Sequence, residues 1–579
     1  MTEEIANAEV VAVYPNKVRV AVDDLINFQA AGESLRVGSF LKVSDNENVS
    51  LICIIESFSI EMKETKTEGA HDSKRVYMID AYPLGTLKNG KFNRGGDELA
   101  IPPKKVVPAT KEEIAAIYAE AFQAQDRFRF SSLTRQRDID VPVHGDRFFN
   151  KHIAVIGASG SGKSSSVTTV LQKAMSAKDG EYKGLNNSHI LIFDLHSEYA
   201  TAFPRANVIT VDDLVLPYWL LNEDEMEDMF LESGDNNNYN QEALLRSIVT
   251  IAKKIGNPDI DKVNFDSPLP YDIQHVANAF RNLTRETKNA ENSLQIKFKD
   301  GSEIEFDDVE AQLNYYCREP REFAAPERSK INKGPYADGS IDKFERRVRS
   351  KISNARLSFI FGEEAKAATL EEVLKQFTGY RDNLETNVTI IDLSGIPFEL
   401  LSITVSLISR LMFDFCYYAR RAENSTEQPF LMVYEEAHKY APKSGLARFK
   451  ASLAAIERIA KEGRKYGISL LISSQRPSEI SETIFSQCSN FLAMRLTNPD
   501  DQSYVRRLLP DTLGNLTEGM PALEQGEALL IGDAVIMPCV VYVEPCNPAP
   551  ASSDVKYLAL WKEEWRKIDF KKRATRWRG

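Results

Sequence analysis

The sequence predicts an α/β protein in which a doubly wound parallel sheet is preceded by a small N-terminal β-barrel. Up to about residue 110, the chain consists of short segments rich in β-branched residues that are separated by turns. From Lys151 onward, short apolar segments alternate with helical ones, which is typical of a parallel sheet covered on both faces. Between the two regions lies a proline-punctuated stretch of about 40 residues.

The first 110 residues favour a barrel because closing a sheet on itself removes its exposed edges. The polar stretch 63–74 is interpreted as a turn between two of its strands. Residues 111–150 are interpreted as a connector, in which 111–124 have helical character. The strands expected in the barrel are 10–22, 36–43, 49–58 and 76–84.

The parallel sheet is predicted in two parts, residues 151–214 and 376–545. Between them the alternation of strands and helices stops, and 215–375 read as a helical insertion with charged helices near 222–231 and 241–254. Residues 546–579 form a C-terminal basic tail. The strands expected in the sheet, each short and apolar, are 152–156, 189–194, 388–393, 430–434 and 468–474.

Composition limits the classes of function. The chain has 579 residues, enough for two or three domains, and its 43% hydrophobic and 27% charged content is that of a soluble globular protein. We see no uninterrupted apolar run long enough to span a bilayer and no basic-then-apolar start, so we expect a cytoplasmic protein without a membrane partner. The six cysteines have no zinc-ligand spacing. The net charge of −12 means that DNA binding would need a local basic surface.

The most specific motif is a phosphate-binding loop. It matches G-x-x-x-x-G-K-[ST], it follows an apolar strand, and a helix is expected over 164–175. The glycines let backbone N–H groups surround a phosphate, the lysine reaches the β- and γ-phosphates, and the serine after it ligates Mg²⁺. The alternative is a Gly/Ser-rich turn with a chance lysine. The predicted site for ATP and Mg²⁺ comprises Gly157, Ala158, Ser159, Gly160, Ser161, Gly162, Lys163, Ser164 and Ser165, with Ser164 as the metal ligand.

Two acidic residues end a later apolar strand, in the segment Phe430-Leu431-Met432-Val433-Tyr434-Glu435-Glu436-Ala437-His438. Ligands of such sheets bind at the carboxyl ends of the strands. Glu435 is predicted to hold the Mg²⁺ shell through water, and Glu436 to orient and polarise the attacking water as a general base. An acidic turn is the alternative. His438 has no second metal-type ligand at suitable spacing nearby, so we interpret it as an orienting or packing residue.

Polar residues follow two more strands. Gln475 comes after the strand at 468–474, where its amide would reach both the attacking water and the γ-phosphate, so we predict a sensor role. Asp194 ends the strand at 189–194, and Glu198 follows it, which places both at the nucleotide edge, with Asp194 as a further catalytic candidate. For each of these residues an ordinary loop position is the alternative.

Four segments together resemble the HerA branch of the HerA–FtsK ATPases, over nearly the whole chain. The resemblance implies an N-terminal HAS-barrel as in bacterial HerA, a RecA-like P-loop NTPase core with a helical insertion, and a C-terminal brace that reaches a neighbouring subunit. It also implies hexameric rings around DNA. The segments are Asp194-Leu195-His196-Ser197-Glu198-Tyr199, Tyr434-Glu435-Glu436-Ala437-His438, Glu462-Gly463-Arg464-Lys465-Tyr466-Gly467 and Ser473-Ser474-Gln475-Arg476-Pro477.

The resemblance assigns Arg464 to the position of an arginine finger that contacts the nucleotide of the next subunit. Taken alone, Arg464 is one basic residue on a helix. Two residues depart from the family pattern: Lys151 stands where we expect arginine, and Ser197 where we expect glycine. The first departure puts a second arginine finger in doubt.

Double-stranded DNA is expected as a partner mainly from the resemblance, because no helix-turn-helix or zinc finger is present. The local candidates for DNA contact are a basic stretch after the two glutamates and the tail from residue 562, which has eight basic and three acidic residues. Each could instead be a solvated or interface surface. The basic stretch comprises Lys439, Lys443, Arg448 and Lys450.

These features favour a homohexameric, ATP-driven DNA translocase or helicase. Such ATPases act with a partner effector protein, either a nuclease in DNA end processing or a nuclease or sirtuin-type NAD hydrolase in anti-phage defence. The long insertion and the modified motifs favour defence. The alternative is an ATP-binding ring scaffold that assembles and activates an effector with little translocation. A conjugation or secretion ATPase is disfavoured because we see no membrane anchor.

Overall fold

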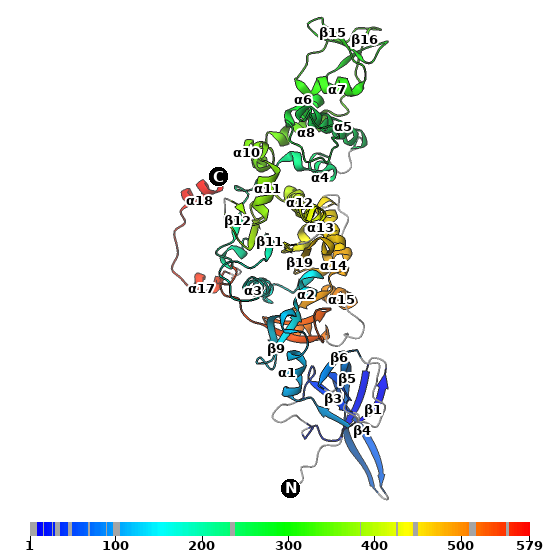
Figure 1. The fold of residues 1–579 in the computed structure, drawn as a ribbon, viewed down its shortest axis with the longest axis vertical. Coiled ribbons are helices and arrows are strands. Elements are labelled where there is room, and N and C mark those ends of the chain that lie inside the picture. The colour runs from blue at the N-terminus through cyan, green and yellow to red at the C-terminus, as the bar shows by residue number, and fades with distance from the viewer. Residues whose placement is uncertain are drawn as a thin grey trace.

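The computed structural model places three parts of the chain along one long axis (Figure 1). A small β-barrel lies at one end, an eleven-stranded sheet with its helices in the middle, and a mostly helical insertion at the other end. The structure describes residues 8–14, 17–25, 27–28, 35–44, 49–67, 70–88, 90–95, 105–231, 238–381, 384–423, 427–443, 450–508, 517–551 and 555–578.

The N-terminal sheet closes on itself because β2 pairs with both β1 and β5. Along β2, alternate residues point inward, and Val18, Val20 and Val22 are fully buried. The strands follow the order β2-β1-β7-β3-β4-β5-β6. Their bounds are β1 (Ala8–Tyr14), β2 (Lys17–Val22), β3 (Phe40–Ser44), β4 (Val49–Thr67), β5 (Ala70–Lys88), β6 (Lys91–Arg94) and β7 (Lys105–Pro108).

The stretch 63–74 differs from the expected turn. β4 and β5 continue through it as a hairpin, with Lys63 opposite Lys74 and Thr67 opposite Ala70. In Figure 1 this hairpin extends beyond the barrel. Backbone pairing between two strands does not need an apolar face, so a polar composition does not by itself end a strand.

The first seven strands in the order of the central sheet are parallel, and the remaining four pair in antiparallel fashion. The order is β12-β17-β11-β18-β19-β10-β20-β21-β22-β8-β9. β10, β18 and β19 are buried along their whole length, as expected for strands covered on both faces. The parallel strands are β10 (Ile153–Ile156), β11 (His189–Asp194), β12 (Asn207–Ile209), β17 (Val388–Asp392), β18 (Phe430–Tyr434), β19 (Ile468–Ser474) and β20 (Asn490–Ala493).

Residues 111–150, which we expected to be a connector, contribute two strands to the central sheet. Arg127–Leu133 form β8, which pairs with β22 so that Leu133 lies opposite Val541. The alternation of Phe128 and Phe130 with polar residues was the signal for this strand. The elements of this region and its partners are α1 (Lys111–Ala119), β8, β9 (Asp140–His144), α2 (Gly145–Asn150), β21 (Glu527–Gly532) and β22 (Cys539–Val543).

The insertion contains two small hairpins as well as the expected helices. Their strands are three residues long, too short to show an alternating pattern: β13 (Thr287–Asn289) pairs with β16 (Ile331–Lys333), and β14 (Gln295–Lys297) with β15 (Glu303–Glu305). The helices are α4 (Glu223–Phe230), α5 (Asn238–Gly256), α6 (Ile273–Leu283), α7 (Val309–Arg318), α8 (Asp342–Ile352), α9 (Ser358–Phe361), α10 (Glu363–Ala367) and α11 (Leu370–Phe377).

A buried ion pair joins the insertion to the central part. Glu225 of α4 is fully buried, and its Oε2 lies 2.9 Å from Nη2 of Arg410 in α12 (Phe398–Glu423). Ser406 also donates to Glu225 Oε1 at 2.8 Å. By length and composition alone, α12 is the one helix among the described residues that could cross a membrane, but 78% of its most apolar window is buried inside the protein. A long, apolar helix that is mostly buried is also common in the core of a soluble protein.

His152 joins three elements just before β10. Its Nδ1 accepts the N–H of Leu470 in β19 at 3.1 Å, and its Nε2 faces the carbonyl oxygen of Ala460 at 2.9 Å. Ala460 lies in the last turn of α13 (Lys450–Glu462). Because Nδ1 accepts, Nε2 carries the proton and the ring is neutral. Burial, with a smaller effect of the charge of Arg464, lowers the pKa of His152 to about 4 against the opposing effect of the hydrogen bond to Ala460.

We predict that His152 makes the protein less stable in acid. The unfolded chain binds a proton near pH 6.5 and the folded chain only near pH 4, so stability falls as pH falls between these values. The loss from pH 7 to pH 5 amounts to about 2 kcal/mol of unfolding free energy. Denaturant unfolding of wild type and His152→Asn at both pH values measures it. Asparagine does not titrate and tolerates the left-handed backbone at this position, where φ is 53°. An equal pH dependence in both proteins would contradict the prediction.

Candidate active site

Four strand ends meet at one edge of the central sheet. β10, β11, β18 and β19 are parallel, so the loops that follow them emerge at the same edge. β19 lies between β10 and β18. Gln475, which follows β19, is therefore placed between the phosphate loop (residues 157–164) after β10 and the two glutamates after β18.

Two backbone hydrogen bonds fix the start of the phosphate loop to neighbouring segments. Gly157 N donates to Ser474 O at 3.2 Å and Ala158 N to Arg495 O at 2.8 Å. A Cβ on Gly157 would lie 2.6 Å from Ser161 Oγ, so a larger residue does not fit there. Gly162, with φ of 96°, begins α3 (Lys163–Ser176). The first N–H groups of a helix have no intrahelical acceptor, so this loop and helix start fit a phosphate.

Glu436 is the centre of the side-chain contacts. Its Oε1 lies 2.6 Å from Lys163 Nζ and accepts Gln475 Nε2–H at 2.8 Å. Burial by itself would raise the pKa of Glu436, but Lys163 and the hydrogen bond from Gln475 outweigh it and hold the pKa below its ordinary value. Its backbone is left-handed, with φ of 47°, an uncommon and strained conformation for a residue other than glycine. Glu436 is thus an ionised acceptor in direct contact with Lys163 and Gln475.

Glu435 is buried beside other acidic groups. Its Oε2 accepts the N–H of Leu195 at 3.2 Å. Burial, together with the neighbouring acids Asp194, Glu436 and Glu198, raises the pKa of Glu435 to about 8 against the opposing effect of Lys163. Such a concentration of carboxylate oxygens fits a hard divalent cation such as Mg²⁺, which prefers oxygen ligands. Glu435, together with the half-buried hydroxyl of Ser164, is therefore chemically suited to hold it.

Asp194 is engaged with its own loop. Its Oδ2 accepts Tyr199 N–H at 2.9 Å and its Oδ1 accepts His196 N–H at 3.2 Å. It is fully buried, and burial raises its pKa. These contacts shape the loop after β11, and none joins Asp194 to Lys163 or Glu436 among the described residues.

Ser197, which stands where the family pattern has glycine, has a left-handed backbone with φ of 56°. Glycine adopts this conformation without strain. The serine gains hydrogen bonds instead: its Oγ donates to Asp392 Oδ2 at 2.8 Å and lies 2.9 Å from Ser394 Oγ. Asp392 ends β17, so Ser197 links two neighbouring strand ends.

His438 contacts the carboxylate of Glu436. Its Nδ1 lies 3.3 Å from Glu436 Oε2 and 3.1 Å from Ser474 Oγ. Burial lowers the pKa of His438, although the charge of Glu436 opposes that shift. His438 therefore spans the ends of β18 and β19 and orients Glu436.

Arg464 lies apart from this cluster. It is exposed in a short turn, Gly463–Tyr466, just before β19, whereas Gln475 follows the same strand. Seven residues of strand separate the two edges by about 20 Å. Lys151 lies at the same far edge, 2.7 Å from Asp533. The structure thus brings together Lys163, Glu436 and Gln475 but not Arg464.

The basic candidates for DNA contact differ in their surroundings. Lys439 is exposed, whereas Lys443 pairs with Glu482 at 2.6 Å and Lys450 with Asp224 at 3.4 Å. Arg448 lies outside the described residues.

The last members of the predicted ATP site lie at the start of α3 and at the loop tip. Ser159 and Gly160 are exposed, and Ser165 Oγ lies 3.3 Å from Cys546 Sγ. The sequence reasoning missed the other flank of the loop, where Met494 and Arg495 follow β20. The only sequence feature that indicated this flank is a short apolar run at 491–493, which is too brief to predict a strand.

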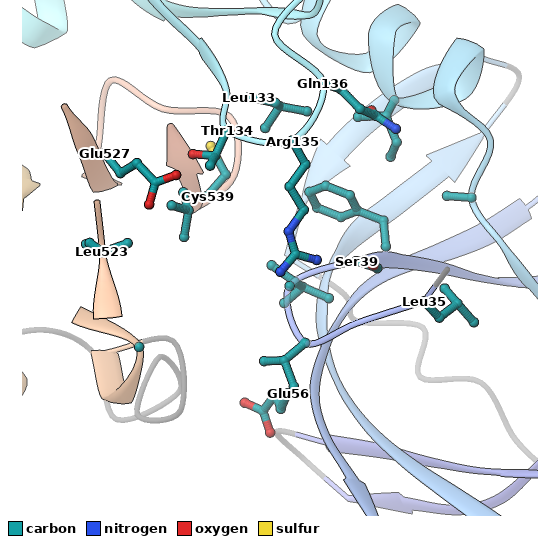
Figure 2. A pocket seen from close by; sticks show the side chains of 18 of the residues that line it. Leu35, Ser39, Glu56, Leu133, Thr134, Arg135, Gln136, Leu523, Glu527 and Cys539 are labelled. Atoms are coloured by element: carbon teal, nitrogen blue, oxygen red, sulfur yellow. The ribbon is translucent and has the colours of Figure 1, made fainter. Parts of the chain in front are cut away.

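A cavity of about 580 Å³ lies between the barrel and the central part (Figure 2). In Figure 2, Arg135 projects into it between Glu56 of the barrel and Glu527 of β21. Burial lowers the pKa of Arg135. None of the residues assigned to ATP above lines this cavity.

Comparison with known proteins places the chain among helicases. The family described as Helicase HerA, central domain, matches residues 128–412. A probable helicase of Methanocaldococcus jannaschii is 22% identical over 96% of this chain and 95% of its own. The DNA double-strand break repair helicase HerA of Sulfurisphaera tokodaii is 26% identical over 85% of this chain and 83% of its own. The solved structure of VirB4 of Thermoanaerobacter pseudethanolicus covers 74% of this chain and 98% of its own, at 13% identity and a TM-score of 0.45.

Two substitutions should separate nucleotide binding from hydrolysis. Lys163→Ala removes the charge that faces the phosphates and should abolish ATP binding. Glu436→Gln keeps the shape but removes the base, so it should retain binding and lower kcat by about 10²–10⁴-fold. Calorimetric titration and phosphate release measure the two effects. Normal turnover in Glu436→Gln would assign the base elsewhere.

Proposed function

Because the chain belongs to the HerA-type ATPases, we propose that it is a hexameric, ATP-driven DNA translocase that acts with a partner effector enzyme. The observation that carries the proposal is the division of the catalytic groups between two edges of one sheet. Lys163, Glu436 and Gln475 lie at the carboxyl edge, and Arg464 lies at the opposite edge. Arg464 can therefore meet only the nucleotide of another subunit. Head-to-tail contacts of this kind form a ring when the rotation between subunits closes.

The residues at the carboxyl edge have separate tasks in ATP hydrolysis. Lys163 and the loop amides bind the β- and γ-phosphates, and Glu436 accepts the proton of the attacking water. Gln475, bonded to Glu436 at 2.8 Å, orients that water relative to the γ-phosphate. Ser164, and Glu435 through water, would hold Mg²⁺, which supplies positive charge to the phosphates.

The C-terminal segment supports assembly of several subunits. The described side chains from residue 555 onward are exposed, including Trp561, Trp565 and Trp577 at 76%, 91% and 92%. In Figure 1 this segment, with α17 (Tyr557–Trp561) and α18 (Phe570–Arg578), runs outside the body of the protein. Large exposed aromatic side chains mark interaction surfaces. We assign the segment to a brace on the neighbouring subunit.

Double-stranded DNA is the proposed substrate of translocation. The relatives named above are helicases, and one is named for DNA double-strand break repair. In a ring, an exposed lysine such as Lys439 is repeated six times about one axis, so weak phosphate contacts add up. The proposed effector is a nuclease or a sirtuin-type NAD hydrolase, in DNA end processing or anti-phage defence. A cytoplasmic location belongs to the same proposal.

Displacement of a triplex-forming strand from duplex DNA tests translocation. Purified protein with ATP should release the third strand, and Glu436→Gln should not. Intact rings that hydrolyse ATP but release no strand would contradict the motor and favour a scaffold that assembles the effector.

Mixing variants tests the sharing of the site. Arg464→Ala should lower kcat by about 10³-fold or more, as expected for an arginine finger. Subunits of Lys163→Ala, which are inactive themselves, should restore part of that activity by donating Arg464 to a neighbour. No recovery at any mixing ratio would show that Arg464 does not act between subunits.

A further inference from the structure

We propose that Arg495 is a second catalytic arginine, which contacts the terminal phosphate of ATP from the same subunit as the phosphate loop. Arg495 follows β20, which adjoins β10 on the side opposite β19. It thus flanks the phosphate loop on the side away from Glu436 and Gln475. The proposal rests on the proposed ATPase activity and does not depend on DNA.

Two contacts fix Arg495 beside the loop. Its carbonyl oxygen accepts the N–H of Ala158 at 2.8 Å. Its Nη2 lies 3.9 Å from the position that a Cβ on Gly160 would take. The backbone of Arg495 therefore contacts the start of the phosphate loop, and its guanidinium lies near the loop tip.

The neighbouring Met494 leaves little freedom at this position. A Cβ atom added to Gly157 would lie 2.9 Å from the Cβ of Met494. A Cβ atom added to Gly162 would lie 3.5 Å from the Cε of Met494. The segment that carries Arg495 is thus packed along the loop, so the guanidinium is supported by a rigid base.

The guanidinium of Arg495 forms no hydrogen bond or ion pair with any residue that the structure describes. Two other half-buried arginines are ion-paired, Arg410 with Glu225 at 2.9 Å and Arg19 with Asp80 at 2.8 Å. An unpaired cation beside a loop of N–H donors attracts an anion, and a guanidinium matches phosphate oxygens in a bidentate way.

The location of Gly160 indicates which phosphate is contacted. Gly160 lies at the exposed tip of the loop, three residues before Lys163 at the start of α3. Lys163 serves the β- and γ-phosphates, so the tip lies toward the outer end of the chain of phosphates. Arg495 would then neutralise charge on the γ-phosphate from one side, while Lys163 does so from the other.

Steady-state hydrolysis is the first test. Arg495→Ala should lower kcat by about 10²-fold or more, and Arg495→Lys, which keeps the charge, should lose less. Arg506→Ala, on the exposed face of α15 (Pro499–Leu508), removes the same charge nearby and should keep the wild-type rate. A kcat within about threefold of wild type for Arg495→Ala would overturn the proposal, since a contact with transition-state charge is worth far more.

Binding distinguishes a phosphate contact from a structural role. In a Glu436→Gln background, Arg495→Ala should weaken ATP binding about tenfold, or 1.4 kcal/mol, and leave ADP binding nearly unchanged. An equal loss for ATP and ADP would overturn the assignment to the terminal phosphate.

The mixing experiment decides which subunit Arg495 serves. Because Arg495 is proposed to act on its own phosphate loop, Lys163→Ala subunits should not restore activity to Arg495→Ala subunits. Recovery would show that Arg495 acts on a neighbour. Failure of strand displacement alone leaves these ATPase results unaffected, so the translocase proposal and this one are separately testable.

Discussion

The ion pair between Lys163 and Glu436 is the interaction on which the active site depends. Its atoms lie 2.6 Å apart, and both side chains are almost fully buried, so either charge alone would be costly. The pair joins the loops after β10 and β18 across the intervening β19. In the proposed ATPase, a phosphate of ATP would replace Glu436 as the anion beside Lys163, and the released carboxylate would then be free to contact water. Nucleotide binding would thereby also prepare the proposed base.

The residues of this pair could be predicted because each follows an apolar strand, and parallel strands bring their carboxyl ends to one edge. Glu435 and Gln475 were found by the same reasoning. Arg495 could not be found, because β20 has four residues and its apolar run carries no periodic signal. Asp194 stays a prediction: its place at a strand end suggested catalysis, and in the structure its carboxylate holds the following loop.

The fold was predictable to a similar extent. The strands expected at 189–194, 430–434 and 468–474 agree with the structure to the residue, because continuous apolar runs define them. The strands within residues 111–150 were not predicted, because the local sequence does not show which distant strand pairs with β8. The hairpins of the insertion and the long β4–β5 hairpin were missed for a related reason. Hydrogen bonding between two strand backbones does not require a particular pattern of polar and apolar side chains.

His152 has a consequence for the whole assembly. It holds the last turn of α13 to β19 at the start of β10, so the strand that bears the phosphate loop and the turn that bears Arg464 belong to one rigid unit. In the proposed ring, each subunit would act as a lever between its own nucleotide and that of a neighbour. Hydrolysis at one site would then be coupled mechanically to the next site.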